Sequence, residues 1–338
     1  MRCRAIEPGA DVPLLVEVRQ ILQGVLGPGR PIARIEARPS PYTSSYRLEI
    51  LDVELEGGRR LELLLKSYGL AGLTDLGRRA KPVEVLDPLR PIEVHRTVLA
   101  DGSLGTPRCY GAVAAPTGDR HWLLLEAVEG LRLSHVGDFG TWQRAAAWAA
   151  RFHARFPEEA PSVIELERPL SQDAAWWRHW MARALARVER ADPPAVRDGF
   201  VRLADRHERV VERLRALPRS LLHGEFCADN ILVSGAGPDQ RICPVDWEMT
   251  ARGPALLDLA ALVGGRWSDD ERRELALAYR EAMPPPRPEV ERFLQDLDVC
   301  RLQWAIQWTG WFDGHRPPPW QDQDWAMEAL TLGERLGL

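Results

Sequence analysis

The stretch LLHGEFCADNILV at residues 221–233, together with ICPVDWE at residues 242–248, decides the fold. Apolar runs alternate with polar positions, which predicts a strand, a loop, a second strand, a turn and a third strand. Such a hairpin brings Glu225, Asn230 and Asp246 to one rim. Oxygen ligands of this kind suit Mg²⁺, and a carboxylate can orient an attacking hydroxyl. The stretch therefore predicts a site for phosphoryl transfer.

The order His-Gly-Glu-x-x-x-x-Asn followed by Val-Asp-Trp-Glu resembles the catalytic and metal-binding segments of the aminoglycoside phosphotransferase and choline kinase-like family. The resemblance implies an α+β, bilobal protein kinase-like fold. Residues 1–126 would form a small antiparallel-sheet lobe that binds nucleotide, and residues 127–338 a larger, mostly helical lobe. It also implies a small-molecule kinase that uses ATP (or GTP) and Mg²⁺ to phosphorylate a hydroxyl of an aminoglycoside, an aminoalcohol or a similar metabolite.

The roles in this segment follow from the resemblance. Glu225 stands where the family has a catalytic aspartate, Asn230 and Asp246 stand as metal ligands, and His223 and Asp258 support the loop. Glutamate keeps the charge but adds a methylene, roughly 1.5 Å, and about 1 Å of misplacement can cost on the order of a hundredfold in rate. An alternative therefore stays open, a nucleotide-binding pseudokinase or scaffold without transfer activity.

Composition limits the partners. The formal net charge of -5 gives no global basic surface, so we expect a nucleotide and a small-molecule acceptor, not nucleic acid or anionic membrane. No apolar run is long enough to cross a bilayer, and the chain is expected to be cytoplasmic. Five cysteines without Cys-x-x-Cys spacing argue against a disulfide framework and a zinc site.

Lysine is rare in this chain, because all but two of its 44 basic residues are arginine. Lys66 ends a strand expected over residues 61–66, and the resemblance makes it the ligand of the nucleotide α- and β-phosphates. An ordinary lysine at a strand end is the alternative. Lys81 precedes Pro82 and is expected to be a solvated loop residue.

Further nucleotide contacts are implied by position. The loop over residues 39–45 has no glycine, so Ser44 and Ser45 are the candidates to donate to a phosphate, unless the loop is a plain strand connection. Glu126 and Val128 stand where the family's hinge binds the base through its main chain.

A helix expected over residues 91–99 resembles the helix whose glutamate orients the strand lysine. Pro91 occupies the place of the first glutamate in the family pattern, so Glu93 is the nearest acid, and Glu84 is the second choice. The pairing with Lys66 is a prediction.

Helical periodicity predicts further helices over residues 10–30, from residue 141, over 171–190 and over 194–216. His153 is expected to be a packed core histidine. Three tryptophans are spaced along one face of a C-terminal helix, and acids lie near them in the sequence: Trp304, Trp308, Trp311, Asp296, Asp298 and Asp313. Aromatic faces beside acids suit a cationic or sugar-like acceptor, with core packing as the alternative.

Overall fold

The computed structural model describes residues 12–42, 45–69, 72–115, 120–237, 240–265, 267–311 and 323–338. The chain divides into two compact units, residues 1–79 with 107–129, and residues 80–106 with 130–338. The sequence predicted one boundary at residue 126, close to the last of these divisions. Residues 80–106, which carry Glu93, group with the second unit.

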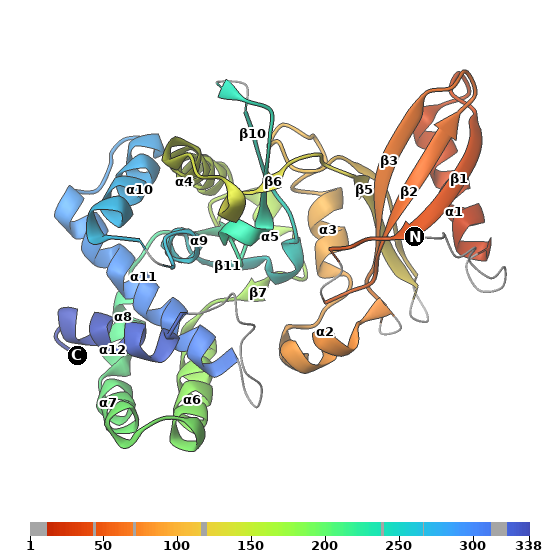
Figure 1. Ribbon diagram of the computed structural model, residues 1–338. Coiled ribbons are helices and arrows are strands. Elements are labelled where there is room, and N and C mark those ends of the chain that lie inside the picture. The colour runs from red at the N-terminus through yellow and green to blue at the C-terminus, as the bar shows by residue number, and fades with distance from the viewer. Residues whose placement is uncertain are drawn as a thin grey trace. The chain divides into compact units, whose positions relative to one another are not determined.

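The first unit is an antiparallel sheet of five strands in the order β1-β2-β3-β5-β4 (Figure 1). Its elements are α1 (Val12–Leu26), β1 (Ile32–Pro39), β2 (Leu48–Leu55), β3 (Arg60–Ser67), α2 (Asp75–Ala80), β4 (Cys109–Ala114) and β5 (His121–Glu126). A turn at Gly57 and Gly58 joins β2 to β3, with φ angles of 91° and 84° that favour glycine. Val18 and Leu22 of α1 pack into the apolar core of this sheet.

The second unit is mainly helical (Figure 1). Its α-helices are α3 (Arg90–Arg96), α4 (Phe139–Arg155), α5 (Pro161–Ile164), α6 (Ala174–Ala191), α7 (Pro194–Asp205), α8 (His207–Arg215), α9 (Leu256–Leu262), α10 (Asp269–Ala282), α11 (Val290–Trp311) and α12 (Trp325–Arg335). The long helix α11 packs against α6, α9 and α12, and α10 packs against α4. The helix predicted over residues 194–216 is wrong as one helix, because the backbone breaks at Arg206 between α7 and α8.

Short strands and single helical turns support the loops of this unit. The strands are β6 (Leu131–Arg132), β7 (Leu170–Ser171), β8 (Arg219–Leu222), β9 (Ile231–Ser234), β10 (Arg241–Pro244) and β11 (Ala251–Pro254). The turns are η2 (Val83–Val85), η3 (Leu133–His135), η4 (Ala228–Asn230) and η6 (Trp247–Met249).

The three strands of the deciding stretch do not form one sheet, which corrects the predicted hairpin. Strands β9 and β10 pair as an antiparallel hairpin beside β6. Strand β8 instead pairs with β11, in a second small sheet with β7. The loop after β8 therefore connects two sheets of the same unit.

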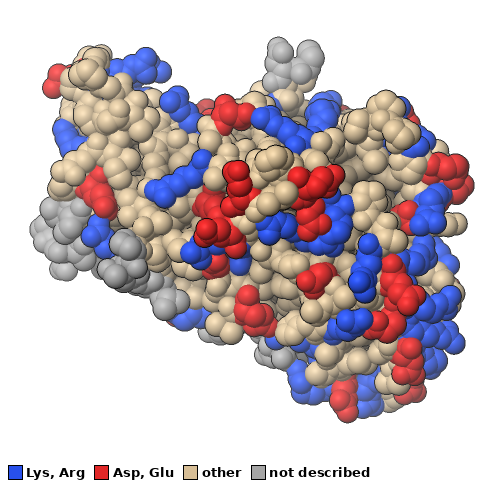
Figure 2. Space-filling view, turned by 180° about the vertical axis from the view of Figure 1, so that it is seen from behind, with Lys and Arg blue, Asp and Glu red and all other residues tan. Residues whose placement is uncertain are grey.

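The α+β class, with an antiparallel sheet in the first unit and helices in the second, agrees with the prediction. On the face drawn in Figure 2, basic and acidic side chains are interspersed. Arg178 and Glu208, in the second unit, form an exposed ion pair. Within the described part of the chain, no helix combines the length and apolar character needed to span a bilayer.

Candidate active site

A buried carboxylate binds the main chain of the loop after β8. Asp258 on α9 is 2% exposed and accepts from the main-chain N–H groups of His223 (2.7 Å) and Gly224 (2.9 Å). The Nε2 of His153 lies 3.1 Å from the same carboxylate, and its Nδ1 lies 2.8 Å from the hydroxyl of Tyr279. His153 is buried, as expected for a core histidine. These hydrogen bonds fix the backbone of the loop at His223 and Gly224.

His223 links this loop to the end of β10. Its side chain is fully buried, and Nε2 donates to the carbonyl oxygen of Val245 at 2.9 Å. That bond leaves Nδ1 to accept from the N–H of Glu225 at 3.4 Å. Burial lowers the pKa of His223, although the charges of Asp258 and Asp246 oppose this shift. A neutral imidazole therefore joins the two halves of the deciding stretch.

The predicted metal ligands lie on the segments that His223 joins. Asn230 ends η4, where its Nδ2 donates to the carbonyl oxygen of Glu225 at 3.1 Å. Its own carbonyl oxygen accepts from the N–H of Val245 at 2.8 Å. Asp246 follows directly and adopts a left-handed backbone with φ 67°. For a residue other than glycine this conformation is uncommon and recurs at functional sites.

The side chains of this region suit a Mg²⁺ ion. Because Asn230 uses its amide nitrogen on Glu225, its amide oxygen is the group left for a cation. Mg²⁺ typically binds through one or two carboxylates together with waters and substrate phosphates, so Asp246 with Asn230 is a sufficient protein donor set. Among the described residues, no group of three or more His, Cys, Asp or Glu side chains could hold a metal ion.

Lys81 lies at this site, and its prediction as a solvated loop residue is wrong. Its side chain is 9% exposed and forms an ion pair with Glu248, whose side chain is 7% exposed. Burial alone would lower the pKa of Lys81, but the carboxylates of Glu248, Asp246 and Glu225 outweigh burial and raise it. The ammonium is therefore charged and stands in the field of all three acids.

In the first unit, Lys66 lies on β3 between β2 and β5. The residue is 7% exposed, and its Nζ lies 5.1 Å from the centre of the Tyr68 ring. Ser45 is half-buried before β2, while Ser44 lies outside the described residues. The predicted phosphate contacts of these residues stay predictions.

The predicted hinge follows β5. Glu126 ends β5, and its N–H donates to the carbonyl oxygen of Arg108 at 2.8 Å. The N–H of Arg108 in turn donates to the Glu126 carboxylate at 3.0 Å. Val128 follows as a half-buried residue. Binding of a base by this main chain stays a prediction.

Both acids considered as partners of Lys66 have contacts inside the second unit. The carboxylate of Glu93 accepts from the N–H groups of Glu167 (2.8 Å) and Arg168 (3.0 Å). Glu84 lies 3.1 Å from His179 Nε2. The pairing of Glu93 with Lys66 stays a prediction.

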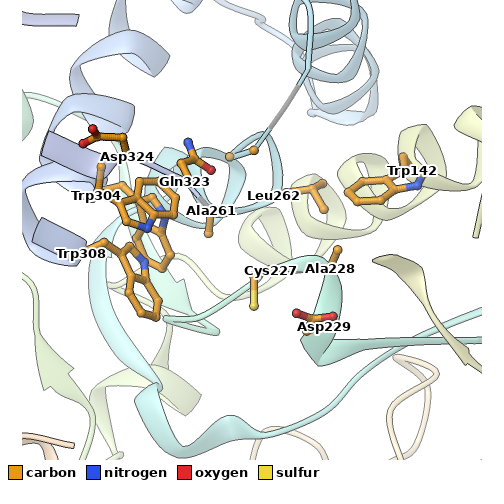
Figure 3. Close-up of a pocket in the computed structure, with 13 residues that line it drawn as sticks. Trp142, Cys227, Ala228, Asp229, Ala261, Leu262, Trp304, Trp308, Gln323 and Asp324 are labelled. Atoms are coloured by element: carbon orange, nitrogen blue, oxygen red, sulfur yellow. The ribbon is translucent and has the colours of Figure 1, made fainter. Parts of the chain in front are cut away.

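A cavity of about 700 Å³ opens beside the loop after β8 (Figure 3). Its wall combines indole rings, two acids and part of the loop after β8: Trp142, Cys227, Ala228, Asp229, Ala261, Leu262, Gly264, Gly265, Trp304, Trp308, Gln323, Asp324 and Trp325. In Figure 3, Trp304 and Trp308 lie on one side, Trp142 lies opposite, and Cys227 to Asp229 lie between them. The Trp308 and Trp325 rings stack with centres 6.1 Å apart.

The cavity corrects part of the predicted acceptor region. Trp304 and Trp308 line it, but Trp311 stacks on Trp180 with ring centres 5.1 Å apart. Asp296 and Asp298 pair instead with arginines on their own helix. Asp313 lies outside the described residues.

The charged and aromatic lining residues that the sequence did not point to are Asp229, Asp324, Trp142 and Trp325. Trp325 opens its own helix, so helical spacing from Trp304 could not reach it.

Cys227 is part of the wall but is a poor nucleophile. Burial, followed by the negative charges of Glu225 and Asp229, raises the pKa of its thiol to about 12. The thiolate, which is the reactive form, is scarce at neutral pH.

Comparison with solved structures supports the fold. A putative aminoglycoside phosphotransferase from Ralstonia eutropha has a TM-score of 0.60 at 13% identity, over 95% of this chain and 97% of that one. Choline kinase from Cryptosporidium parvum has a TM-score of 0.58 at 14% identity, over 96% and 94%. A microcompartment-associated aminopropanol kinase has a TM-score of 0.59 at 15% identity, over 89% and 90%. The predicted kinase-like fold is confirmed.

Comparison of sequences gives the family. A search of curated proteins found no match. The sequence profile of the phosphotransferase enzyme family matches residues 77–294, which is well over half of the chain and includes Glu225, Asn230 and Asp246. The predicted resemblance and the enzyme class are thereby confirmed, and the chain belongs to the phosphotransferase enzyme family.

Proposed function

We propose that this enzyme transfers the γ-phosphate of ATP or GTP to a hydroxyl group of a small cationic molecule, with Mg²⁺ bound at Asn230 and Asp246. The observation that carries the proposal is the cavity beside the catalytic loop, because Cys227 to Asp229 belong to both. An acceptor in this cavity lies next to the loop that carries Glu225.

The acceptor class follows from the cavity wall. The indoles of Trp304, Trp308 and Trp325 offer π faces that attract an ammonium group, and Asp229 and Asp324 add negative charge. A volume of about 700 Å³ is in the usual range for a small-molecule site. Solved structures of this fold include choline kinase and aminopropanol kinase, whose named substrates are amino alcohols. An amino alcohol or amino sugar fits these features.

The proposed reaction gives separate roles to Glu225 and Lys66. The acceptor oxygen forms a bond to the γ-phosphorus while the bond to the bridging oxygen breaks, and the nucleoside diphosphate leaves with that electron pair. The hydroxyl proton passes to Glu225. Lys66 holds the α- and β-phosphates, and a bound Mg²⁺ offsets charge on the phosphate oxygens.

The remaining nucleotide contacts come from the first unit. Ser44 and Ser45 donate to phosphate, and the main chain at Glu126 and Val128 binds the base, as predicted from the sequence. These contacts, like those of Lys66, belong to the proposal.

The test is transfer from Mg-ATP to a panel of amino alcohols and amino sugars, followed by mass spectrometry of the products. At least one acceptor should gain a phosphate, and Asp246→Ala should abolish the gain. Asp296→Ala is a control, because Asp296 lies on α11 and pairs with Arg292. Product formation that survives Asp246→Ala would refute the mechanism.

The same assay distinguishes the proposed kinase from the alternative that Glu225 raises, a nucleotide-binding protein without transfer activity. A binding protein without transfer activity would bind Mg-ATP in calorimetry and phosphorylate nothing, and Glu225→Asp would bring no gain. Faster transfer by Glu225→Asp would identify a slow kinase.

A further inference from the structure

The segment that carries Lys81 is fixed inside the second unit. The Glu84 carboxylate lies 3.1 Å from His179 Nε2 and 3.4 Å from Arg183 Nη1, both on α6. Val85 is 3% exposed. It belongs to an apolar cluster with Trp180, Met249 and Trp311. The segment between α2 and α3 is thus anchored on both α6 and the turn that follows Asp246.

This anchoring places one lysine against the turn η6. Lys81 pairs with Glu248, two residues after Asp246, across 167 positions of the sequence. Both side chains are buried, and taking two charges out of water is costly unless they are paired. Removing one partner leaves the other charge buried and uncompensated. The pair therefore ties Lys81 firmly to η6.

The charges around Lys81 reach beyond its direct partner. The Lys81 ammonium contacts Glu248, and the charges of Asp246 and Glu225 also act on it. Charges interact strongly where little water screens them. A fixed cation at this place weakens the attraction of the site for a divalent ion and limits repulsion between the carboxylates and the phosphate oxygens.

We propose that Lys81 is a positioning residue for phosphoryl transfer: its ammonium fixes the Asp246–Glu248 turn and supplies the permanent positive charge that sets the affinity of this site for the divalent cation. The inference rests on the proposed function for its catalytic part. The cation-binding part stands on the placement of Lys81, Glu248, Asp246 and Glu225.

The first test is Mn²⁺ binding without nucleotide, measured by electron paramagnetic resonance. Lys81→Met removes the charge and keeps an apolar stem, so the affinity for Mn²⁺ should rise by on the order of tenfold. Lys81→Arg keeps the charge and should keep the wild-type affinity. Equal Mn²⁺ affinity in Lys81→Met and wild type would overturn the proposal.

A control separates this effect from lost stability. Arg301 is a buried cation (8% side-chain exposure) that pairs with Asp298 and Glu328. Arg301→Met should lower the unfolding temperature and leave the Mn²⁺ affinity unchanged. A similar rise in both methionine variants would reduce the Lys81 effect to general loosening and overturn the proposal.

The second test is steady-state transfer. Lys81→Met should lower kcat by on the order of a hundredfold with little change in the KM for nucleotide, because fixed charges act mainly where charge develops in the reaction. The double variant Lys81→Met with Glu248→Gln removes both buried charges and should stay slow. Full recovery of kcat in the double variant would mean that Lys81 only neutralises Glu248.

The two tests distinguish a failure of the Lys81 proposal from a failure of the proposed function. If wild-type protein phosphorylates no acceptor, the proposed function fails, but the Mn²⁺ comparison still decides the role of Lys81. If Lys81→Met does not fold, Mn²⁺ affinity and kcat are measured on the double variant and on Lys81→Arg instead. A double variant with both the Mn²⁺ affinity and the kcat of the wild type would then overturn the inference.

Discussion

At the scale of single residues, Gly224 is the described glycine at which an added Cβ would meet the closest contact. Its φ of 87° is in the left-handed region, and a Cβ at this position would lie 1.9 Å from the carbonyl oxygen of Met249. The N–H groups of His223 and of Gly224 itself donate to Asp258, so the loop cannot shift without losing those bonds. We expect Gly224→Ala to lower the free energy of unfolding by about 3 kcal/mol or more and to abolish transfer.

Gly102 offers a matched control for this variant. Its φ is 66°, also left-handed, but a Cβ there would meet nothing within 4 Å. Gly102→Ala should cost only the backbone strain, about 1 kcal/mol, and leave kcat unchanged. Urea unfolding and kcat of both variants check the prediction, and equal losses in the two would contradict it.

The burial of Lys81 could not be predicted from the sequence. The rarity of lysine was visible in the composition, but the burial of Lys81 depends on Glu248, 167 residues later in the chain. Local context, a lysine before a proline, predicts a solvated loop. The roles of Asn230 and Asp246 could be proposed because each lies in a short pattern that resembles a motif of the family.

At the scale of elements, α9 holds the loop after β8 through Asp258. This carboxylate accepts two main-chain N–H groups and the His153 ring. Asp258→Asn replaces one acceptor oxygen by an NH₂ group. At least one hydrogen bond is then lost, because two N–H donors face each other. Because hydrogen bonds to charged groups contribute about 1.5–3 kcal/mol each, stability should fall by about 2–4 kcal/mol. Transfer should slow by at least about tenfold as the loop loses its position.

Asp173 provides the comparison for this second variant. It caps α6 by accepting from the N–H groups of Ala175 and Trp176, so it also binds two main-chain donors. Asparagine is a good N-cap, and Asp173→Asn should cost less than about 1 kcal/mol and leave kcat unchanged. Thermal unfolding and kcat are the measurements. A normal kcat in Asp258→Asn would show that the loop keeps its position without this carboxylate.

Elements were predicted better than their pairing. Apolar runs identified β8, β9 and β10, and helical periodicity identified α4 and α6. The sequence could not show that β8 pairs with β11 instead of β9, because strand partners depend on long-range packing. The same limit applies to the cavity, where Trp142 and Trp325 come from helices far apart in the chain.

At the scale of the whole molecule, buried histidines link stability to pH. Burial is the largest cause that lowers the pKa of His207 and of His223. For His207 the charge of Arg178 acts in the same direction, while the bond to Gln303 and the charge of Glu208 oppose it. Both rings are almost fully covered, at 3% and 0% exposure. Folding therefore favours their neutral forms.

The sign of the pH dependence follows from this preference. Below the ordinary histidine pKa of about 6.5, these histidines bind protons in the unfolded chain but stay neutral in the folded chain. Their full contribution to the free energy of unfolding is therefore present above that pH and is lost as the pH is lowered. Each ring contributes at most about 1.4 kcal/mol per pH unit. Urea unfolding of the second unit between about pH 7.5 and 5 should show this loss, and His207→Gln should reduce the slope. A stability that stays flat or rises on acidification over this range would contradict neutral, buried histidines in the folded enzyme.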